Sequence, residues 1–228
     1  MSAVTLKSVI FFGSAKDIVA PWGGPSRLGD RVLKYVVNTL TDHKGKVGDQ
    51  EVSYDIKVYD PLEVFDPDKG GALAHSGAEC RHPHFFYKPG GAPEPMNIMQ
   101  QEIKDADCYF IVSPEYNHSI PPALSGMMDH FGGSNYAYKP SAIITYTPGP
   151  FCGMRCAMAL RPFLSELGCN PISKLVGFGD AGNLFTDAGG ANSDHPMART
   201  LSQLPKQIEQ LDWYALALKN MREKVPGP

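Results

Sequence analysis

The sequence predicts an α/β protein in which helices cover both faces of a central parallel sheet. Two observations lead to this prediction. Along the chain, short strand-like runs alternate with segments whose apolar residues recur at helical spacing. In addition, residues 108–113 (CYFIVS) form a continuously apolar run, which is typical of a central strand buried on both faces. Strands that alternate with helices in this way form parallel sheets.

We expect five strands, each a short run rich in apolar or β-branched residues. Their expected ranges are 7–13, 52–59, 108–113, 141–146 and 172–177. Right-handed crossover connections leave few arrangements open to five parallel strands. The usual arrangement has the strand order 2-1-3-4-5, which is the flavodoxin-like fold.

Helices are expected between these strands and after the last one. Leu28, Val32, Val36 and Leu40 follow one another at four-residue intervals, which places them on one helix face. The expected helices cover residues 27–40, 96–106, 119–131, 153–167 and 198–221. We expect the last of them to be broken near Pro205, because proline removes a helical hydrogen bond.

The chain length suits one domain that spans residues 1–228. Residues 61–95 are rich in Gly, Pro and His and fit neither a strand nor a helix, so we expect a long loop excursion over the surface. His75, Cys80, His82 and His84 lie in this excursion. Their spacing fits no standard zinc finger, and we expect no metal site.

Charge and composition argue against several classes of protein. The net charge is −3 and no segment forms a basic stripe, which argues against a nucleic-acid binder. No apolar stretch approaches the roughly 20 residues of a membrane helix. The five cysteines form no CxxC pair, which argues against a zinc ribbon or a thioredoxin motif. We therefore expect a reduced, cytoplasmic protein that binds neither nucleic acid nor membrane.

The first of three loops at the carboxyl edge of the sheet has the chemistry of a phosphate site. Ligands of such sheets bind beyond the carboxyl ends of the strands. Ser14 offers a hydroxyl, Lys16 or Arg27 offers a cation, and the following helix offers free N–H groups. Neither GxGxxG nor GxxxxGK[ST] is present, which argues against a Rossmann dinucleotide site and a nucleotide triphosphatase. An ordinary Gly/Pro-rich connection remains the alternative.

The loops after the third and fourth strands have features that suit a flat ligand. In residues 113–124, Tyr116 offers a planar ring and Asn117 a donor and an acceptor. In residues 147–153, glycines allow a ligand to approach the backbone closely. Stiff or flexible turns without a ligand remain the alternative for each loop taken alone.

Three segments resemble the NAD(P)H-dependent FMN reductase family, which includes quinone, azo-dye and chromate reductases with a flavodoxin-like fold. They are SPEYNHSIPPALSGMMDHF, TPGPFCGMRCAMALRPFL, and GSAK followed by SRLGDRVLKYV. The resemblance covers roughly residues 7–177. The chain departs from the family at Lys16, where an arginine is usual, and at Cys152, which replaces the first glycine of a pair. An insertion that includes Trp22 also lengthens the first loop.

The resemblance implies an FMN cofactor and assigns residues to it. Around the phosphate it places Ser14, Lys16, Arg27, Leu28 and Gly29. Against the isoalloxazine ring it places Pro114, Glu115, Tyr116 and Asn117, and over the pyrimidine end Gly149, Pro150, Phe151 and Gly153. His118 and Trp22 are candidate substrate contacts. No catalytic side chain is implied, because the flavin carries the chemistry of hydride transfer.

The function expected from these residues is that of an oxidoreductase. It takes hydride from NADPH or NADH onto FMN and passes two electrons to a quinone or similar small-molecule acceptor, with both substrates using one site in a ping-pong cycle. A flavodoxin-like electron carrier, an FMN-binding signalling module and a scaffold without flavin are the alternatives. The sequence does not distinguish NADH from NADPH.

Two further expectations concern assembly and Cys152. Apolar residues on helices 119–131 and 153–167 exceed what one buried face requires, and the resemblance implies a homodimer or homotetramer. At Cys152 we expect a plain small side chain; a thiol pKa lowered by the nearby start of the expected helix is the alternative.

Overall fold

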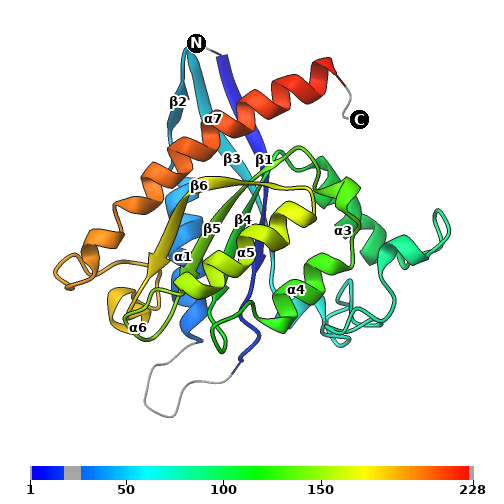
Figure 1. Cartoon of the computed structure of the whole chain (residues 1–228), viewed down its shortest axis with the longest axis horizontal. Helices are drawn as coiled ribbons and strands as arrows, with labels where there is room; N and C mark the ends of the chain where they lie inside the picture. The colour runs from blue at the N-terminus through cyan, green and yellow to red at the C-terminus, as the bar shows by residue number, and fades with distance from the viewer. Residues whose placement is uncertain (1, 18–26, 226–228) are drawn as a thin grey trace.

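The structure, a computed structural model, describes residues 2–17 and 27–225. In this part of the chain the strands form one six-stranded sheet in the order β2-β3-β1-β4-β5-β6 (Figure 1). The strands are β1 (Ser2–Phe12), β2 (Gly45–Val47), β3 (Gln50–Tyr59), β4 (Cys108–Pro114), β5 (Pro140–Tyr146) and β6 (Asn170–Phe178). The run from β3 to β6 is parallel throughout and matches the predicted order 2-1-3-4-5.

The prediction of a purely parallel, five-stranded sheet was wrong at one edge. β2 pairs antiparallel with β3, and Val47 faces Gln50 across a two-residue turn. Gly48, the first residue of this turn, has φ of 60°, a left-handed conformation that glycine adopts readily. A strand of three residues is too short to show a hydrophobic pattern, and the sequence therefore gave no sign of it.

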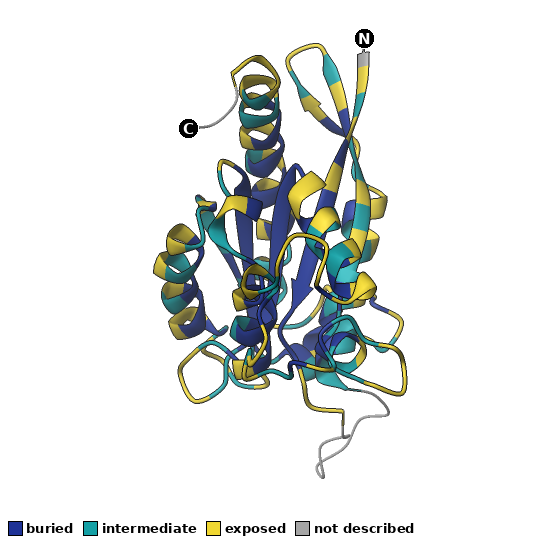
Figure 2. Cartoon of the chain, turned by 90° about the vertical axis from the view of Figure 1, so that its right-hand side faces the viewer, coloured by how far each residue is buried: buried dark blue, intermediate teal, exposed yellow. Residues whose placement is uncertain are grey.

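Helices cover both faces of the sheet, as predicted. The helices are α1 (Leu28–Thr41), α2 (Pro61–Val64), α3 (Glu94–Asp105), α4 (Pro122–Asp129), α5 (Met154–Glu166), α6 (Ala181–Leu184) and α7 (Gln203–Lys224). Alternate residues of β1 point to opposite faces: Ile10 and Phe12 pack with α1 and α7, whereas Val9 and Phe11 pack with α3, α4 and α5. The central strands β4 and β5 are accordingly buried along their whole length, in the dark blue interior of Figure 2.

The terminal helix departs from expectation at its start. α7 is continuous from Gln203, and a separate 3-10 turn, Ala198–Thr200, precedes it. Pro205 lies in the first turn of α7, where backbone N–H groups have no acceptor within the helix. The proline therefore removes no hydrogen bond and breaks nothing. None of the helices in the described ranges has the length and hydropathy that a bilayer span needs.

The excursion at 61–95 is folded against α4. Leu73 and Ser76 are fully buried. A Cβ atom at Gly126 of α4 would lie 2.0 Å from the Ala78 carbonyl oxygen, so only glycine allows the excursion to pack this closely. The expectation of a loop confined to the surface was therefore wrong, because this segment contributes side chains to the core.

A chain of hydrogen bonds fastens the excursion to the end of α4. The His82 N–H donates to Ser76 Oγ (2.8 Å), which lies 2.7 Å from His130 Nε2. His130 Nδ1 lies 2.5 Å from the Gly126 carbonyl oxygen. A carbonyl only accepts, so Nδ1 carries the proton and Nε2 accepts from Ser76. Burial lowers the pKa of His130, which matches this neutral form.

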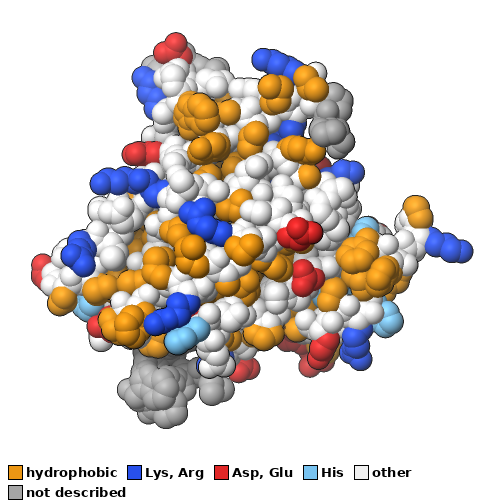
Figure 3. All heavy atoms as spheres, viewed as in Figure 1, with side chains coloured by type: hydrophobic (Ala, Val, Ile, Leu, Met, Phe, Trp, Pro, Cys, Tyr) orange, Lys and Arg blue, Asp and Glu red, His pale blue; other side chains and the backbone are white. Residues whose placement is uncertain are grey.

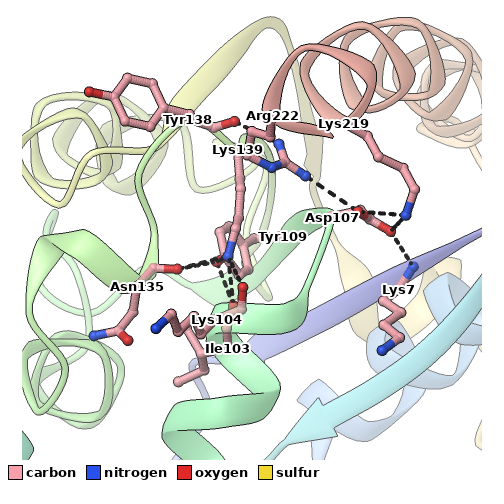
Figure 4. A network of polar contacts seen from close by, with 10 residues as sticks. All are labelled: Lys7, Ile103, Lys104, Asp107, Tyr109, Asn135, Tyr138, Lys139, Lys219 and Arg222. Atoms are coloured by element: carbon pink, nitrogen blue, oxygen red, sulfur yellow. Dashed lines mark hydrogen bonds and ion pairs between the residues drawn. The ribbon is translucent and has the colours of Figure 1, made fainter. Parts of the chain in front are cut away.

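At the amino edge of the sheet, charged residues tie α3 and α7 to the strands (Figure 4). Asp107 accepts hydrogen bonds from the Lys7 backbone N–H and from Lys219 Nζ. Lys139 Nζ is buried and lies within 3.1 Å of four oxygen atoms, among them the Ile103 carbonyl of α3. Burial lowers the pKa of Lys139 to about 8.

We predict that His130 makes the protein less stable in acid. Its pKa is lowered in the folded state, so below pH ~6.5 the unfolded chain binds a proton that folded His130 resists. The contribution is fully present above that pH and is lost as the pH falls. Urea unfolding of wild type and His130→Gln at pH 7.5 and 5.5 should show a smaller stability difference at pH 5.5. A difference independent of pH would contradict the neutral assignment.

Candidate functional site

The three loops meet at one edge of the sheet because β1, β4 and β5 are neighbouring parallel strands. Phe12 pairs with Val112, and Pro114 pairs with Tyr146. Hydrogen bonds continue past the strand ends, from the Gly13 N–H to the Val112 carbonyl (2.8 Å) and from the Glu115 N–H to the Tyr146 carbonyl (3.3 Å). The loops after β1, β4 and β5 are called loops one, two and three below.

The amino end of α1 lies against loop one and the end of β5. A Cβ atom at Gly29 would lie 2.4 Å from the Tyr146 hydroxyl oxygen and 3.0 Å from Ser14 Cβ. Tyr146 is 2% exposed, and burial raises its pKa, an effect that Ser14 beside it opposes. Its hydroxyl makes no hydrogen bond of ordinary geometry to a described residue. A buried hydroxyl of this kind beside free helix N–H groups suits an anionic ligand.

Arg27 differs from the free cation that the sequence suggested. Its Nε donates to Asp30 (2.7 Å), one terminal nitrogen donates to the Ser14 carbonyl (3.0 Å), and both terminal nitrogens contact the Asp60 carboxylate. Asp60 also caps α2 by accepting the Leu62 N–H (2.9 Å). Arg27 thus joins loop one to the end of β3, and its planar fork is already taken by carboxylates.

Lys16 is exposed and lies beside loop two. Its Nζ is 4.6 Å from the centroid of the Tyr116 ring, which is a cation–π distance. The contact links loop one to loop two. Of the two cations of loop one, Arg27 is held by carboxylates, so Lys16 is the one whose charge lies at the surface. Trp22, a candidate substrate contact, lies outside the described residues.

Loop two ends in a tight turn with two left-handed residues. Tyr116 and Ser119 exchange backbone hydrogen bonds of 3.2 Å and 2.9 Å, and Asn117 and His118 between them have φ of 49° and 62°. Positive φ at both central residues is the geometry of a type I′ turn. The turn exposes the side chains of Asn117 and His118.

Glu115 connects loop two to α5. Its carboxylate accepts the backbone N–H groups of Arg155 (3.0 Å) and Cys156 (3.1 Å), and the Arg155 guanidinium lies 3.5 Å away. These N–H groups belong to the first turn of α5, where the helix itself supplies no acceptor. Only 6% of the Glu115 side chain is exposed. The carboxylate therefore acts as an N-cap supplied by another segment of the chain.

Loop three is held by its own backbone and by the segment after β6. Thr145 Oγ1 donates to the Cys152 carbonyl (2.8 Å), and the Asp180 N–H donates to the Gly149 carbonyl (2.9 Å). Gly153 has φ of 70°, and a Cβ atom there would lie 2.8 Å from Thr145 Cβ. Phe151, near Pro150 at the tip of the loop, is 65% exposed.

The structure does not support the alternative of a lowered thiol pKa at Cys152. Burial raises the pKa of Cys152, and the nearby Gly179 backbone and Arg199 oppose this only partly. Glu115 already occupies the first turn of α5, which leaves less positive potential for the thiol. Cys152 has φ of 58°, so a non-glycine residue adopts the left-handed conformation here.

Sequence reasoning missed Tyr146 and Asp60. Both lie at the carboxyl edge, since Tyr146 ends β5 and Asp60 follows β3. A polar residue at that place in a strand was the available signal. Within the described ranges no group of three or more His, Cys, Asp or Glu residues is arranged to hold a metal ion. His75 contacts the Tyr87 hydroxyl instead (3.1 Å).

The two helix starts at this edge differ in what they offer a ligand. The N-terminus of α1 lies beside the buried hydroxyls of Ser14 and Tyr146, which suits a phosphate. The N-terminus of α5 is closed by the Glu115 carboxylate, and the loops beside it present Tyr116 and Phe151. One site for an anion and one for a neutral planar group fit the two ends of FMN.

Comparisons with known proteins identify the family. The sequence pattern of the family described as NADPH-dependent FMN reductase matches residues 7–183. A quinone reductase from Pseudomonas putida is 31% identical over 106 residues, which are 44% of this chain and 56% of that protein. An NAD(P)H-dependent FMN reductase from Pseudomonas aeruginosa is 32% identical over 125 residues, which are 53% of this chain and 66% of that protein.

The first of these matches spans only about half the length of the curated relative. Among solved structures, the flavoenzyme NAD(P)H:(acceptor) oxidoreductase FerB from Paracoccus denitrificans superimposes with a TM-score of 0.58. The alignment covers 94% of this chain and 98% of that one at 16% identity. At this identity the likeness concerns the fold alone.

Proposed function

The chain belongs to the NADPH-dependent FMN reductase family, and from this we propose that it is an FMN-containing oxidoreductase. It takes hydride from NADPH or NADH and passes two electrons to a quinone. The observation that carries the proposal is a contrast between two helix starts: α1 begins beside the buried hydroxyls of Ser14 and Tyr146, whereas the first turn of α5 is capped by the Glu115 carboxylate.

The FMN phosphate is proposed to lie at the start of α1. The backbone N–H groups of Leu28 and Gly29 belong to the first turn, and Ser14 and Tyr146 supply hydroxyls. Lys16 supplies the positive charge. Arg27 is assigned a supporting role, because its guanidinium holds the Ser14 carbonyl and Asp60 in place.

The isoalloxazine ring is proposed to lie between loops two and three. The residues that contact it are Pro114, Glu115, Tyr116 and Asn117 from loop two and Gly149, Pro150, Phe151 and Gly153 from loop three. FMN, when bound, supplies the hydride-transfer chemistry. The chain orients the ring, excludes water from one of its sides with Tyr116 and Phe151, and leaves His118 at the tip of loop two to contact substrate.

A quinone is proposed as the acceptor because two relatives that are 31% and 33% identical over aligned stretches of 106 and 87 residues are named quinone reductases. The same relatives favour an enzyme over a non-enzymatic electron carrier.

A test of the phosphate site compares three variants by FMN titration. Charge-assisted and neutral hydrogen bonds to a phosphate contribute about 1–3 kcal/mol each, so Lys16→Ala and Tyr146→Phe should each raise the Kd for FMN at least about fivefold. Arg27→Ala should lower the free energy of unfolding of the flavin-free protein, because it leaves Asp60 and Asp30 without their partner. Unchanged FMN affinity in Lys16→Ala and Tyr146→Phe would contradict the assignment.

A kinetic test addresses the order of the two half-reactions. Because a single isoalloxazine ring is proposed to lie between loops two and three, NAD(P)H and quinone must bind against it one after the other. Initial rates of NADPH oxidation at several quinone concentrations should give parallel double-reciprocal lines. Intersecting lines would show that both substrates bind together and would rule out the ping-pong cycle.

A homodimer or homotetramer is proposed from the exposed face of α5. Met154 and Met158 are 37% and 59% exposed and continue from Phe151, where apolar side chains gather on the surface (Figure 3). The expected contribution of α4 was wrong, because its apolar residues, Met127 and Met128 among them, are fully buried against the sheet. Light scattering should give at least twice the mass of 24.8 kDa, and Met158→Glu should lower it. A monomeric wild type would refute the proposal.

A further inference from the structure

The carboxylate of Glu115 puts a negative charge where loops two and three meet. It accepts two N–H groups of the first turn of α5, at 3.0 Å and 3.1 Å, and only 6% of its side chain is exposed. Tyr116 and Asn117 follow it directly in the chain. The charge therefore lies at the junction of loop two and the first turn of α5, next to the loops between which the ring is proposed to lie.

The cap changes what α5 offers to a ligand. A free helix N-terminus carries about half a positive charge, which stabilises a neighbouring anion. In this chain the carboxylate faces that partial charge and so cancels much of it. The start of α5 is therefore poorly suited to stabilise negative charge on a ligand, in contrast to the start of α1 beside Ser14 and Gly29.

The cations near Glu115 compensate its charge only in part. The Arg155 guanidinium is 3.5 Å from the carboxylate, but 45% of its side chain is exposed and it also lies 5.0 Å from the Phe151 ring. Lys16 is exposed as well, over Tyr116. Water and salt screen exposed charges more than buried ones, and the partial charge of a helix start is smaller than one unit, so the buried carboxylate keeps part of its negative charge.

We propose that the buried carboxylate of Glu115 lowers the reduction potential of the bound FMN. The inference rests on the proposed function. Reduction by two electrons with uptake of one proton adds one negative charge to the flavin, and a buried carboxylate between loops two and three disfavours that charge. The reduced cofactor is thereby a stronger reductant toward a quinone.

The test measures the two-electron midpoint potential of the FMN-loaded protein by dye equilibration. Glu115→Gln removes the charge and keeps an oxygen that accepts the Arg155 and Cys156 N–H groups. Glu115→Ala removes both the charge and the cap. Glu166→Gln makes the same change of charge at the other end of α5, where the side chain is exposed, and serves as the matched control.

We expect Glu115→Gln and Glu115→Ala both to raise the potential, by about 30 mV for each tenfold tightening of reduced relative to oxidised FMN. We expect a change of about tenfold, and Glu166→Gln should keep the wild-type potential. The ratio of the Kd values for oxidised and reduced FMN should change by the same factor, which gives a second readout independent of turnover.

A wild-type potential in Glu115→Gln while FMN is bound would overturn the inference alone. If Glu115→Ala then still raised the potential, the increase would come from a structural effect of the cap. An equal increase in Glu166→Gln would also overturn the inference, since any lost charge would then suffice. Wild-type protein that binds no FMN would overturn the proposed function itself.

Discussion

The hydrogen bonds from the Arg155 and Cys156 N–H groups to the Glu115 carboxylate fix the position of loop two relative to loop three. These loops follow the neighbouring strands β4 and β5, which bring them together but do not set the orientation of their tips. The cap does so, because it ties the first residue after β4 to the first turn of α5. Loss of such a cap costs about 1 kcal/mol, and more where the group is buried.

The same cap divides the carboxyl edge into two parts with different chemistry. At α1 the helix start lies beside Ser14 and the buried Tyr146 hydroxyl, an arrangement that suits an anion. At α5 the helix start is closed, and the neighbouring loops present rings and backbone. A ligand with a phosphate at one end and a flat heteroaromatic ring at the other matches this division, and the orientation of FMN in the proposal follows from it.

The alternation of apolar runs was enough to predict the parallel strands and the helix layers, since burial on both faces leaves a clear pattern in runs such as residues 108–113. The pattern did not reveal β2, which has three residues, or the role of Pro205, which depends on the turn of α7 that contains it. A strand of three residues is too short to show a period, and the exact residue at which a helix starts is the least reliable part of a prediction from periodicity.

The site was predictable to the level of its loops but not of its side-chain partners. Arg27 is held by Asp60, which is 33 residues away in the sequence. Cys152 lacks the effect of a helix start partly because Glu115 reaches that helix from 40 residues away. Such pairings arise when strands far apart in sequence become neighbours, and no local pattern encodes them.

The central claim is that the open start of α1 binds the phosphate of the cofactor while the ring lies by α5. Calorimetric titration of the flavin-free protein with FMN and with riboflavin tests this claim most directly, because the two ligands differ only in the phosphate. The account predicts that FMN binds at least about a hundredfold more tightly, as several charge-assisted hydrogen bonds imply. Equal affinity for the two flavins would contradict it.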